Sequence, residues 1–208
     1  MKLVVLGATG GTGVEIVRQA VEQGHSVTAF VRAPRRLEQF NGRIAVVEGD
    51  LLNSVELERV GRAQDAVLSG FGPRMPASRA DAHLLRRFAA ALTSAMLAAR
   101  VRRVVVVSVA FLFKDSIIPP AYLLGRLLFP GIVADAAAME EVFETSGLDW
   151  TIVRPPGLTD RLATGKYRVR PGHLPRFGLS ISRADVADYM LKAIPDQATI
   201  GKIIGVCN

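Results

Sequence analysis

The sequence predicts an α/β fold in which a doubly wound parallel sheet is covered by helices on both faces, within a single domain. Short apolar stretches of strand character alternate along the chain with stretches of helical periodicity. The connections between them are short, and parallel strands joined by right-handed crossovers place helices on both sides of a sheet. The length of 208 residues leaves room for one core of this kind rather than two.

The first half of the chain is expected to hold four strands separated by helices. The apolar run 2–6 predicts the first strand, and the helix 12–23 that follows it is expected to stop at Gly24. Ser54 is expected to cap a short helix that continues to Val60. Runs of β-branched and apolar residues predict the other three strands at 26–31, 44–47 and 66–69.

The second half continues the same alternation. A helix rich in alanine and leucine is expected over 77–100. The continuous valine run that ends at Ser108 is typical of a central parallel strand buried on both faces. Ser182 is expected to cap a helix, with Asp185 in the place of the usual glutamate of a capping box. The remaining elements are a strand at 150–154, that capped helix at 182–194 and a last strand at 202–206.

Composition indicates a well-packed globular chain. Half of the residues are hydrophobic, 22% are charged and the mean hydropathy is +0.28, which excludes disorder as the main state. The apolar runs are far shorter than the roughly 18 residues of a membrane-spanning helix, and the first residues lack the features of a signal peptide. We therefore expect a cytoplasmic protein with no membrane partner. Cys207 and three dispersed histidines predict neither an internal disulfide nor a metal site.

The charge balance first suggests a nucleic-acid partner. The chain has 26 Lys and Arg against 19 Asp and Glu, a formal net charge of +7 and a pI near 10.2. The basic residues, however, form short clusters such as Arg100, Arg102 and Arg103, without a stripe that carries interleaved aromatics. We therefore expect no nucleic-acid partner, and a small phosphate-rich ligand explains at least one cluster better.

The strongest motif lies directly after the first predicted strand and opens a helix. Glycines in this pattern permit a tight turn, let backbone N–H groups approach a pyrophosphate and allow close packing of helix on strand, while the helix N-terminus favours the anion. In this position the motif predicts a Rossmann-type dinucleotide site, with a tight turn that binds nothing as the alternative. The expected contacts are Gly7, Thr9, Gly10, Gly11, Thr12 and Gly13.

The residues after the second predicted strand indicate which dinucleotide binds. An acidic residue there would accept a hydrogen bond from a ribose 2′-hydroxyl, whereas an arginine accommodates a 2′-phosphate. Arg32 stands at that point, Arg35 and Arg36 follow, and Glu38 is the first acidic residue. Because a guanidinium matches phosphate geometry and stays charged, the sequence favours NADP(H). The alternative is a solvated basic loop.

Two residues after the third predicted strand are expected to contact the adenine. Asp50 can accept a hydrogen bond from the adenine amino group, and Leu51 would lie beside the ring. The alternative is that Asp50 only caps a turn or helix.

Six segments together resemble the atypical short-chain dehydrogenases of the NmrA-like, NAD(P)H-binding group, and within that group the flavin and biliverdin reductases. They read GATGGTG, TAFVRAPRRL, VVEGDLL, VVVVSVAFLF, SGLDWTIVRPPGL and ISRADVADYML, and the resemblance covers essentially the whole chain. It implies a Rossmann-type domain that uses NADPH to reduce flavins, biliverdins or similar planar conjugated molecules. By position it implies cofactor contacts at Thr9, Gly10, Thr12, Arg32, Arg36, Asp50, Leu51, Phe71, Gly72 and Arg74, with Ser108, Val109, Pro155 and Pro156 bordering the nicotinamide.

The sequence departs from the family where proton donors are expected. The reductases carry a serine after the fifth strand and a histidine after the Pro-Pro pair, and the matching positions here are Val109 and Gly157. Ordinary short-chain dehydrogenases carry a Tyr-x-x-x-Lys pair, for which this chain has Ile132 and Ala136. The resemblance therefore identifies no catalytic acid.

Two residues are local candidates for that role. On a helix starting at the 119–120 proline pair, Tyr122 and Arg126 would share a face, so the tyrosine could donate a proton beside a permanent positive charge. Ser108 could also donate to a developing oxyanion. The alternatives are a lid helix with Tyr122 facing solvent and a Ser108 that only hydrogen-bonds the strand end. A flavin or quinone acceptor needs neither, because it can collect its proton from water.

The irregular stretches 70–78, 111–131 and 155–176 all follow predicted strands, so they are expected to form the ligand site at the carboxyl ends of the sheet. The second is unusually apolar for a loop and would form a wall over the nicotinamide, which suits a planar aromatic substrate. A dimer interface or plain core is the alternative, so monomer and dimer both stay open.

Three functions remain for this set of residues. The first is an NADPH-dependent reductase that transfers hydride to a planar conjugated acceptor such as a flavin, a quinone, a biliverdin-like molecule or an aromatic ketone. The second is a non-catalytic NADP(H)-binding sensor or regulator, which the absent Tyr, Lys, Ser and His motivate. The third is an isomerase or dehydratase that uses the cofactor transiently.

Overall fold

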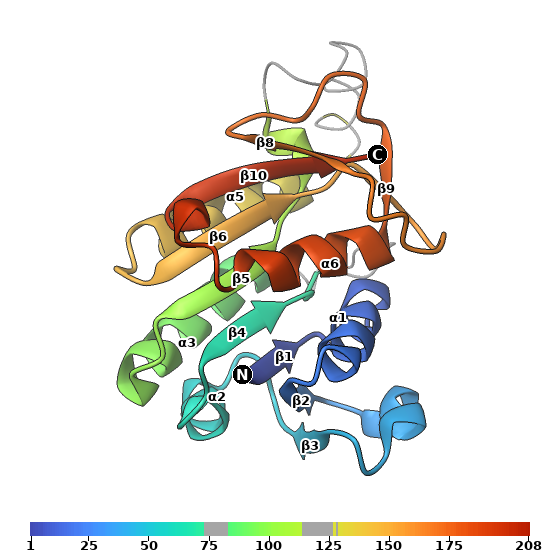
Figure 1. The fold of residues 1–208 in the computed structure, drawn as a ribbon. Helices are drawn as coiled ribbons and strands as arrows, with labels where there is room; N and C mark the ends of the chain where they lie inside the picture. Colours follow the sequence, from blue (N-terminus) through green and yellow to red (C-terminus); the bar gives the residue numbers. More distant parts are fainter. Residues whose placement is uncertain (73–82, 114–126, 128) are drawn as a thin grey trace.

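A computed structural model describes residues 1–72, 83–113, 127 and 129–208 and confirms the doubly wound α/β fold (Figure 1). The main sheet has eight strands in the order β3-β2-β1-β4-β5-β6-β10-β8, all parallel except β8, which runs antiparallel to β10. Its strands are β1 (Lys2–Leu6), β2 (Ser26–Val31), β3 (Ala45–Glu48), β4 (Ala66–Ser69), β5 (Arg103–Val107), β6 (Asp149–Arg154), β8 (Arg168–Pro171) and β10 (Lys202–Cys207).

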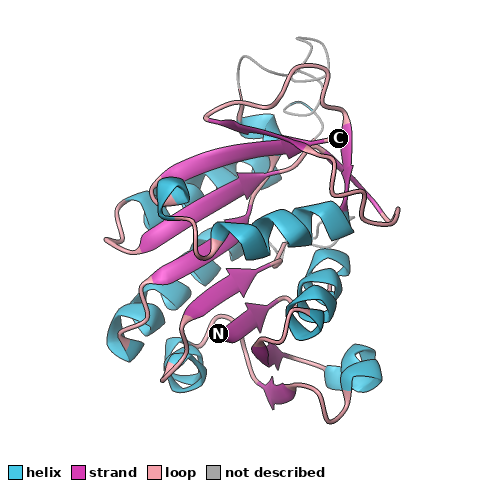
Figure 2. Ribbon diagram, in the orientation of Figure 1, coloured by secondary structure: helices cyan, strands magenta, loops and turns pink. Residues whose placement is uncertain are grey.

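Helices cover both faces of this sheet (Figure 2). Helices α1 (Gly11–Glu22) and α6 (Arg183–Ala193) lie on one face. Helices α2 (Ser54–Gly61), α3 (Leu84–Ala99) and α5 (Pro130–Glu144) lie on the other. Short 3₁₀ turns follow β2, β5 and α6, at η1 (Pro34–Phe40), η3 (Ala110–Leu112) and η4 (Gln197–Thr199), and β7 (Gly157–Thr159) pairs with β9 (Ser180–Ser182) in a small separate sheet.

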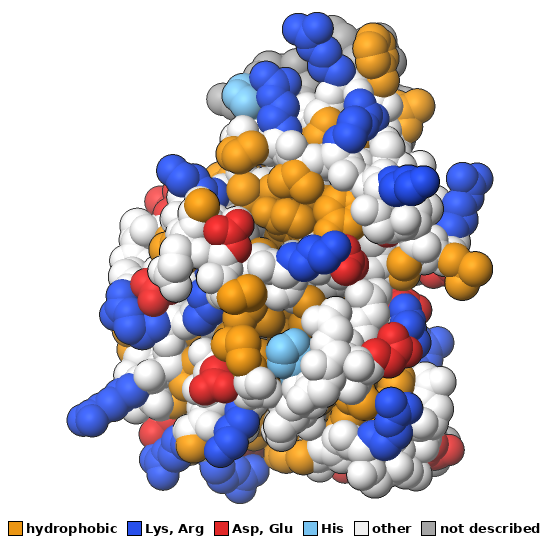
Figure 3. Space-filling view, in the orientation of Figure 1, with side chains coloured by type: hydrophobic (Ala, Val, Ile, Leu, Met, Phe, Trp, Pro, Cys, Tyr) orange, Lys and Arg blue, Asp and Glu red, His pale blue; other side chains and the backbone are white. Residues whose placement is uncertain are grey.

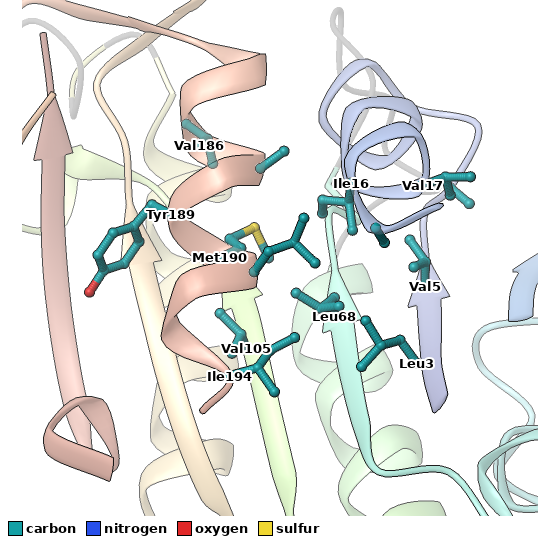
Figure 4. Packing of buried hydrophobic residues seen from close by; sticks show 14 of the residues in the cluster. Leu3, Val5, Ile16, Val17, Leu68, Val105, Val186, Tyr189, Met190 and Ile194 are labelled. Carbon is teal, nitrogen blue, oxygen red and sulfur yellow. The ribbon is translucent and has the colours of Figure 1, made fainter. Parts of the chain in front are cut away.

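Successive residues of each central strand point into different cores. In β1, Val5 packs with α1 and α6, whereas Val4 packs with α2 and α3. Figure 4 shows the first core, in which Ile16 of α1 and Met190 of α6 meet side chains of β1, β4 and β5. This two-sided burial explains why the central strands read as continuous apolar runs rather than as alternating ones.

The strand order reverses at β1. The chain runs outward from β1 through β2 to β3 and then returns to β4 on the other side of β1. The carboxyl ends of β1 and β4 therefore flank the topological switch point, where open α/β sheets bind their ligands.

Most expected elements are present, and their boundary residues behave as the sequence indicates. Gly24 follows α1 with φ +77°, which a glycine adopts without strain. Ser182 caps α6, because its Oγ accepts a hydrogen bond from the backbone N of Asp185 at 2.9 Å. Helix α3 is described from Leu84 onward, so the expected start near 77 lies outside the described residues.

The expected cap of α2 was wrong by one residue. The cap is Asn53, whose Oδ1 accepts hydrogen bonds from the backbone N of Val55 at 3.1 Å and of Glu56 at 3.3 Å. Ser54 is instead the first helical residue. Both residue types cap helices well, and only the extended backbone of Asn53 distinguishes the cap position.

Helix α5 and the short strands β7 and β8 were not predicted. Helix α5 begins at Pro130, at the end of a stretch expected to be irregular, and its alanine-rich sequence offers no clear polar face. Strands β7 and β8 lie in the third stretch expected to be irregular, 155–176, and all four residues of β8 are exposed, so its side chains carry no buried pattern. Backbone pairing with β10, distant in sequence, makes β8 a strand.

A carboxylate on α5 caps α3 from outside the helix. Asp135 is buried, and its two oxygens accept hydrogen bonds from the backbone N of Leu85 at 2.8 Å and of Arg86 at 3.1 Å. The residue at the cap position itself, His83, makes no side-chain cap bond. Asp135 therefore satisfies two N–H groups of α3 that have no intrahelical acceptor, and it ties the two helices together.

Arg103 is buried at the amino-terminal edge of the sheet, where it closes the end of α6. Its guanidinium donates to the carbonyl oxygens of Ala193 at 2.5 Å, Ile194 at 3.0 Å and Asp149 at 2.7 Å, and to Thr199 Oγ1 at 2.9 Å. A cation at these carbonyls also faces the negative end of the helix dipole. Burial lowers the pKa of Arg103, and nearby Asp149 and Asp196 oppose that shift.

No helix among the described residues combines the length and the apolar character that crossing a membrane requires.

On the face seen in Figure 3, Lys and Arg side chains are spread over the surface rather than aligned in one stripe. Hydrophobic side chains gather on this face between β8 and α6.

Replacing Arg103 with Ala should lower the free energy of unfolding by about 3 kcal/mol, because buried carbonyl groups lose their donor. The matched control is Arg102→Ala, since the Arg102 side chain is 62% exposed and its pair with Asp149 should contribute about 1 kcal/mol or less. Urea denaturation measures both. Equal losses in the two variants would contradict this role for Arg103.

Candidate functional site

The glycine-rich loop lies where β1, β4 and α1 approach one another most closely. A Cβ added to Gly13 would lie 2.0 Å from the carbonyl oxygen of Gly7, and a Cβ on Gly7 would lie 2.7 Å from the backbone N of Phe71. Gly7 also has φ +68°. A Cβ on Gly70, after β4, would lie 3.0 Å from the backbone N of Gly13. These glycines let the helix start directly above the switch point.

The start of α1 is open to an anion. Its cap residue Gly10 makes no side-chain hydrogen bond, and no acidic residue stands in the first turn. Gly11 is exposed, whereas Thr12 and Gly13 are buried beneath it. The first N–H groups of a helix have no intrahelical acceptor and carry the positive end of its dipole, so this loop fits the pyrophosphate of a dinucleotide.

The predicted basic residues border the same loop. Arg32 follows β2 directly and is exposed. Arg36, in η1, is also exposed, and its Nη1 donates to the carbonyl oxygen of Thr9 at 3.0 Å. This bond brings the guanidinium of Arg36 across to the glycine-rich loop. Two positive charges therefore stand near the end of β2, where the sequence predicted a 2′-phosphate site.

Asp50 and Leu51 follow β3 as expected. The Oδ1 atom of Asp50 accepts from the backbone N of Leu52 at 3.0 Å, and the backbone N of Asp50 donates to Glu56 Oε2 at 2.8 Å. The structure thus shows the turn-capping role that was the alternative for Asp50, with the side chain on the exposed edge of the site. Leu51 is buried in the core beneath it, which leaves little of its side chain to meet a ligand.

Phe71 and Gly72 lie beyond β4, opposite the glycine-rich loop. The Phe71 ring packs against the ring of Phe88 on α3, with centroids 4.8 Å apart. Phe71 is half-buried and therefore adds apolar surface at the carboxyl edge of the sheet, and Gly72 is exposed. The predicted contact Arg74 lies outside the described residues.

The expected nicotinamide border comes together after β5 and β6. The backbone N of Ser108 donates to the carbonyl oxygen of Val153 at 2.8 Å, and the backbone N of Ala110 donates to that of Pro155 at 3.2 Å. These bonds place Ser108 and Val109 beside the Pro155-Pro156 turn. Ser108 Oγ is buried and has no hydrogen-bond partner among the described residues. A buried hydroxyl without a partner is uncommon, and at a ligand edge it suits a bound polar atom.

The second catalytic candidate, Tyr122, lies outside the described residues, together with Arg126 and residues 114–126 of the apolar stretch. The described beginning of that stretch is apolar and partly covered. Leu112 is half-buried, and Phe113 is buried in a small cluster with Leu174 and Cys207.

A buried ion pair beneath this region was not predicted. Arg154, the last residue of β6, donates from Nε to Glu140 Oε1 of α5 at 2.9 Å and makes a second contact from Nη2 to Glu140 Oε2. Its guanidinium also lies 4.7 Å from the centre of the Phe113 ring. Two features of the sequence could have indicated this ion pair: Arg154 is a charged residue at the end of an apolar strand, and Glu140 is a charged residue in an alanine-rich helix. The pair holds Phe113 against the end of β6.

The Asp185 carboxylate binds the hydroxyl of the cap residue Ser182 and also the loop after β7. It is fully buried and accepts hydrogen bonds from the backbone N of Thr164 at 2.8 Å, the backbone N of Gly165 at 2.9 Å, Thr164 Oγ1 at 3.0 Å and Ser182 Oγ at 2.9 Å. Burial alone would raise the pKa of Asp185, but these hydrogen bonds outweigh burial and lower it. The ionised carboxylate therefore fastens the loop after β7 to the start of α6.

Arg183, the first residue of α6, lies directly on the glycine-rich loop. Its Cδ and Nε atoms are 2.6 Å and 2.7 Å from the position that a Cβ on Gly11 would occupy. Its Nη1 donates to Asp160 Oδ1 at 2.5 Å, in the loop after β7. The motif ISRADVADYML contains Arg183, but periodicity alone gave no reason to place this side chain at the loop. Within the described part of the chain, no three His, Cys, Asp or Glu residues form a group that could hold a metal ion.

A glycine-rich loop that opens a helix at the switch point of a doubly wound sheet defines the dinucleotide-binding class of Rossmann-type proteins. A family model described as NAD(P)H-binding matches residues 7–197. The chain belongs to this NAD(P)H-binding family, and this confirms the expected dinucleotide-binding membership.

Relatives and solved structures agree with this membership. An uncharacterized chloroplastic protein of Arabidopsis thaliana is 29% identical over 214 residues, which covers 99% of this chain and 76% of that protein. A short-chain dehydrogenase/reductase from Veillonella parvula, solved in complex with NADP, has a TM-score of 0.86 at 20% identity and covers 100% of this chain and 94% of that one. ChuY, an anaerobilin reductase from Escherichia coli O157:H7, has a TM-score of 0.81 at 20% identity, with 100% and 97% covered. The two structures show the shared fold.

Replacing Asp185 with Asn should lower the free energy of unfolding at pH 7 by about 2 kcal/mol, because a buried charged acceptor of four hydrogen bonds is lost. The folded-state pKa of Asp185 is below its unfolded value, so its contribution is complete above about pH 4 and is lost as pH falls through the folded pKa. The difference between the two proteins should therefore shrink in acid. Denaturation at several pH values tests this, with exposed Asp160→Asn as the control. A difference that stays constant down to acid pH would contradict it.

Proposed function

We propose that the protein is an NADPH-dependent reductase that transfers hydride to a planar conjugated acceptor. The observation that carries this proposal is Ser108 Oγ, a buried hydroxyl without a partner among the described residues, at the carboxyl end of β5. It stands beside Val109 and the Pro155-Pro156 turn, where the nicotinamide of a cofactor anchored at the glycine-rich loop would lie. A ligand oxygen at this point would satisfy the hydroxyl.

The residues around Ser108 favour an acceptor held by contact rather than by charge. Phe71, Val109 and Leu112 are half-buried apolar residues of the same edge, and two flat conjugated rings can pack together on such a surface. Bound NADPH would supply the hydride, and the protein's part is to keep the two rings in contact and away from water. The fold-level neighbour ChuY, an anaerobilin reductase, supports the choice of a reductase.

The proton can come from two sources under this proposal. Ser108 Oγ can donate to an acceptor oxygen that gains negative charge, whereas a flavin or quinone can take its proton from water. Tyr122 remains a predicted donor on sequence grounds. The acceptor classes therefore differ in how strongly they should depend on Ser108.

The proposal includes NADPH rather than NADH as the preferred cofactor. Arg32 and Arg36 stand near the end of β2, and the acidic residue that would accept from a ribose 2′-hydroxyl is absent from the sequence there. The proposed place of action is the cytoplasm, the proposed partner is a small aromatic substrate, and no nucleic acid or membrane is involved.

A second function, a non-catalytic NADP(H)-binding sensor, is favoured by one observation on α5. Ile132 is half-buried and Ala136 is fully buried in the core, at the positions where ordinary short-chain dehydrogenases carry their Tyr and Lys. Neither residue can exchange a proton. A sensor would bind the cofactor and change its affinity for a partner without oxidising it.

Incubating the purified protein with NADPH and a panel of FMN, a quinone, biliverdin and an aromatic ketone decides between the two functions. Loss of NADPH absorbance that depends on both enzyme and acceptor is the expected result. NADPH binding without oxidation by any acceptor would reject the reductase and favour the sensor.

Ser108→Ala should lower kcat about a hundredfold for a ketone acceptor, as the loss of a general acid does, while changing flavin reduction little. Thermal unfolding of the variant is the control for its fold. An equal loss with both acceptors would show that Ser108 only supports the site.

Arg32→Glu should weaken NADPH binding much more than NADH binding, because only NADPH carries the 2′-phosphate. Titration of each nucleotide into each protein measures this, with Arg43→Glu, an exposed arginine before β3, as the charge-matched control. Equal weakening for both nucleotides would reject the assignment of the 2′-phosphate to Arg32.

A further inference from the structure

We propose that Arg183 binds the bridging diphosphate of the dinucleotide, and that its guanidinium leaves its ion pair with Asp160 to do so. The proposal rests on dinucleotide binding at the glycine-rich loop, which the proposed function also assumes, but not on hydride transfer. It adds a side chain to a subsite for which the sequence indicated only backbone groups.

The position of the Arg183 side chain is the first argument. Its Cδ and Nε atoms lie 2.6 Å and 2.7 Å, and its Cζ atom 3.5 Å, from the place of a Cβ on Gly11. Gly11 is the first residue of α1, so the guanidinium lies against the first turn of the helix whose N-terminus fits a pyrophosphate. An anion at this helix end would therefore meet a side-chain positive charge as well as the helix dipole.

The residue type at position 11 is the second argument. Gly7 has a positive φ that favours glycine, but Gly11 does not, so its own backbone does not require glycine. A Cβ at this position would lie 2.6 Å from Cδ of Arg183, so the flexible side chain of Arg183 would have to shift away from the helix to make room. The missing side chain at position 11 thus lets the Arg183 side chain lie directly against the first residue of α1.

The present partner of Arg183 is easily exchanged. Asp160 Oδ1 accepts from Arg183 Nη1 at 2.5 Å, but the Asp160 side chain is 88% exposed and that of Arg183 is 28% exposed. An ion pair this open to solvent contributes little to stability, because water competes for both charges. A diphosphate carries more charge than one carboxylate and offers several oxygens to the guanidinium fork, so it should displace Asp160.

The loop that carries Asp160 is fixed independently of this ion pair. Asp185 accepts hydrogen bonds from the backbone N of Thr164 and of Gly165, a few residues after Asp160. The same carboxylate accepts from Ser182 Oγ, next to Arg183. The loop after β7 and the start of α6 therefore stay together, and only the side chain of Arg183 needs to turn from Asp160 to the phosphates.

Nucleotide fragments separate this subsite from the 2′-phosphate subsite. NADPH and NADH both contain the bridging diphosphate, whereas adenosine 2′-monophosphate contains the 2′-phosphate without it. A residue that binds the diphosphate should affect NADPH and NADH alike and leave the monophosphate unaffected. A residue that binds the 2′-phosphate should affect NADPH and the monophosphate and leave NADH unaffected.

The test compares Arg183→Gln and Arg183→Lys with the wild-type protein by calorimetric titration of the three ligands. Arg183→Gln should weaken NADPH and NADH about tenfold each, as expected for the loss of one charge-assisted contact, with unchanged binding of adenosine 2′-monophosphate. Arg183→Lys should recover part of the loss, because it keeps the charge without the fork. Asp160→Asn should leave NADPH binding unchanged or tighten it a few-fold.

Arg161→Gln is the matched control. Arg161 is an exposed arginine next to Asp160, in the loop after β7, and its loss changes the net charge by the same amount. Equal weakening in Arg161→Gln and Arg183→Gln would overturn the proposal, because it would reflect general charge. Weaker binding of all three ligands to Arg183→Gln would overturn it as well, by indicating a disturbed fold. If the wild type binds NADPH and Arg183→Gln binds it equally well, this inference alone fails, and if the wild type binds neither dinucleotide, the proposed function fails with it.

Discussion

The structure depends on one close approach of backbones at the switch point of the sheet. Gly7 at the end of β1, Gly13 in the first turn of α1 and Gly70 after β4 meet with no side chain between them. Because this contact sets the height of α1 above the sheet, it also sets where the helix N-terminus faces the ligand edge. Arg36 on η1 and Arg183 on α6 both reach the loop from elements packed around this point.

Buried charged residues fix the helices and loops at both edges of the sheet, around the contact of the three glycines. Arg103 closes the end of α6 at the amino edge, while Asp185 fixes the start of the same helix and the loop beside it at the carboxyl edge. Arg154 and Glu140 join β6 to α5 under the expected nicotinamide position. Such groups are costly unless every donor and acceptor is satisfied, so each fixes one arrangement of its neighbours. The site is thus held by polar contacts placed at element ends, over a core that is apolar on both faces of the sheet.

The sequence was sufficient for features that are local. The alternation of strands and helices and the glycine-rich loop follow from periodicity and from one short motif, and Ser182 caps α6 because its own neighbours make it a cap. It was insufficient where the partner is distant. Nothing near β8 shows that it pairs with β10, and nothing near Arg183 shows that its stem lies on a glycine more than 170 residues earlier. Asp50 is an intermediate case. The sequence allowed two roles for it, an adenine contact or a turn cap, and the structure shows a turn contact with the backbone N of Leu52.

The antiparallel strand β8 affects whether the sheets of two molecules can pair edge to edge. It forms one outer edge of the sheet, is only four residues long, and carries Arg168, Arg170 and a final Pro171. Short length, positive charge and proline all hinder the addition of a further strand. β3 at the opposite edge is equally short. A protein in which half of the residues are hydrophobic thus has both edges of its sheet poorly suited to continuous pairing, which protects it from aggregation through strand-to-strand contacts at high concentration.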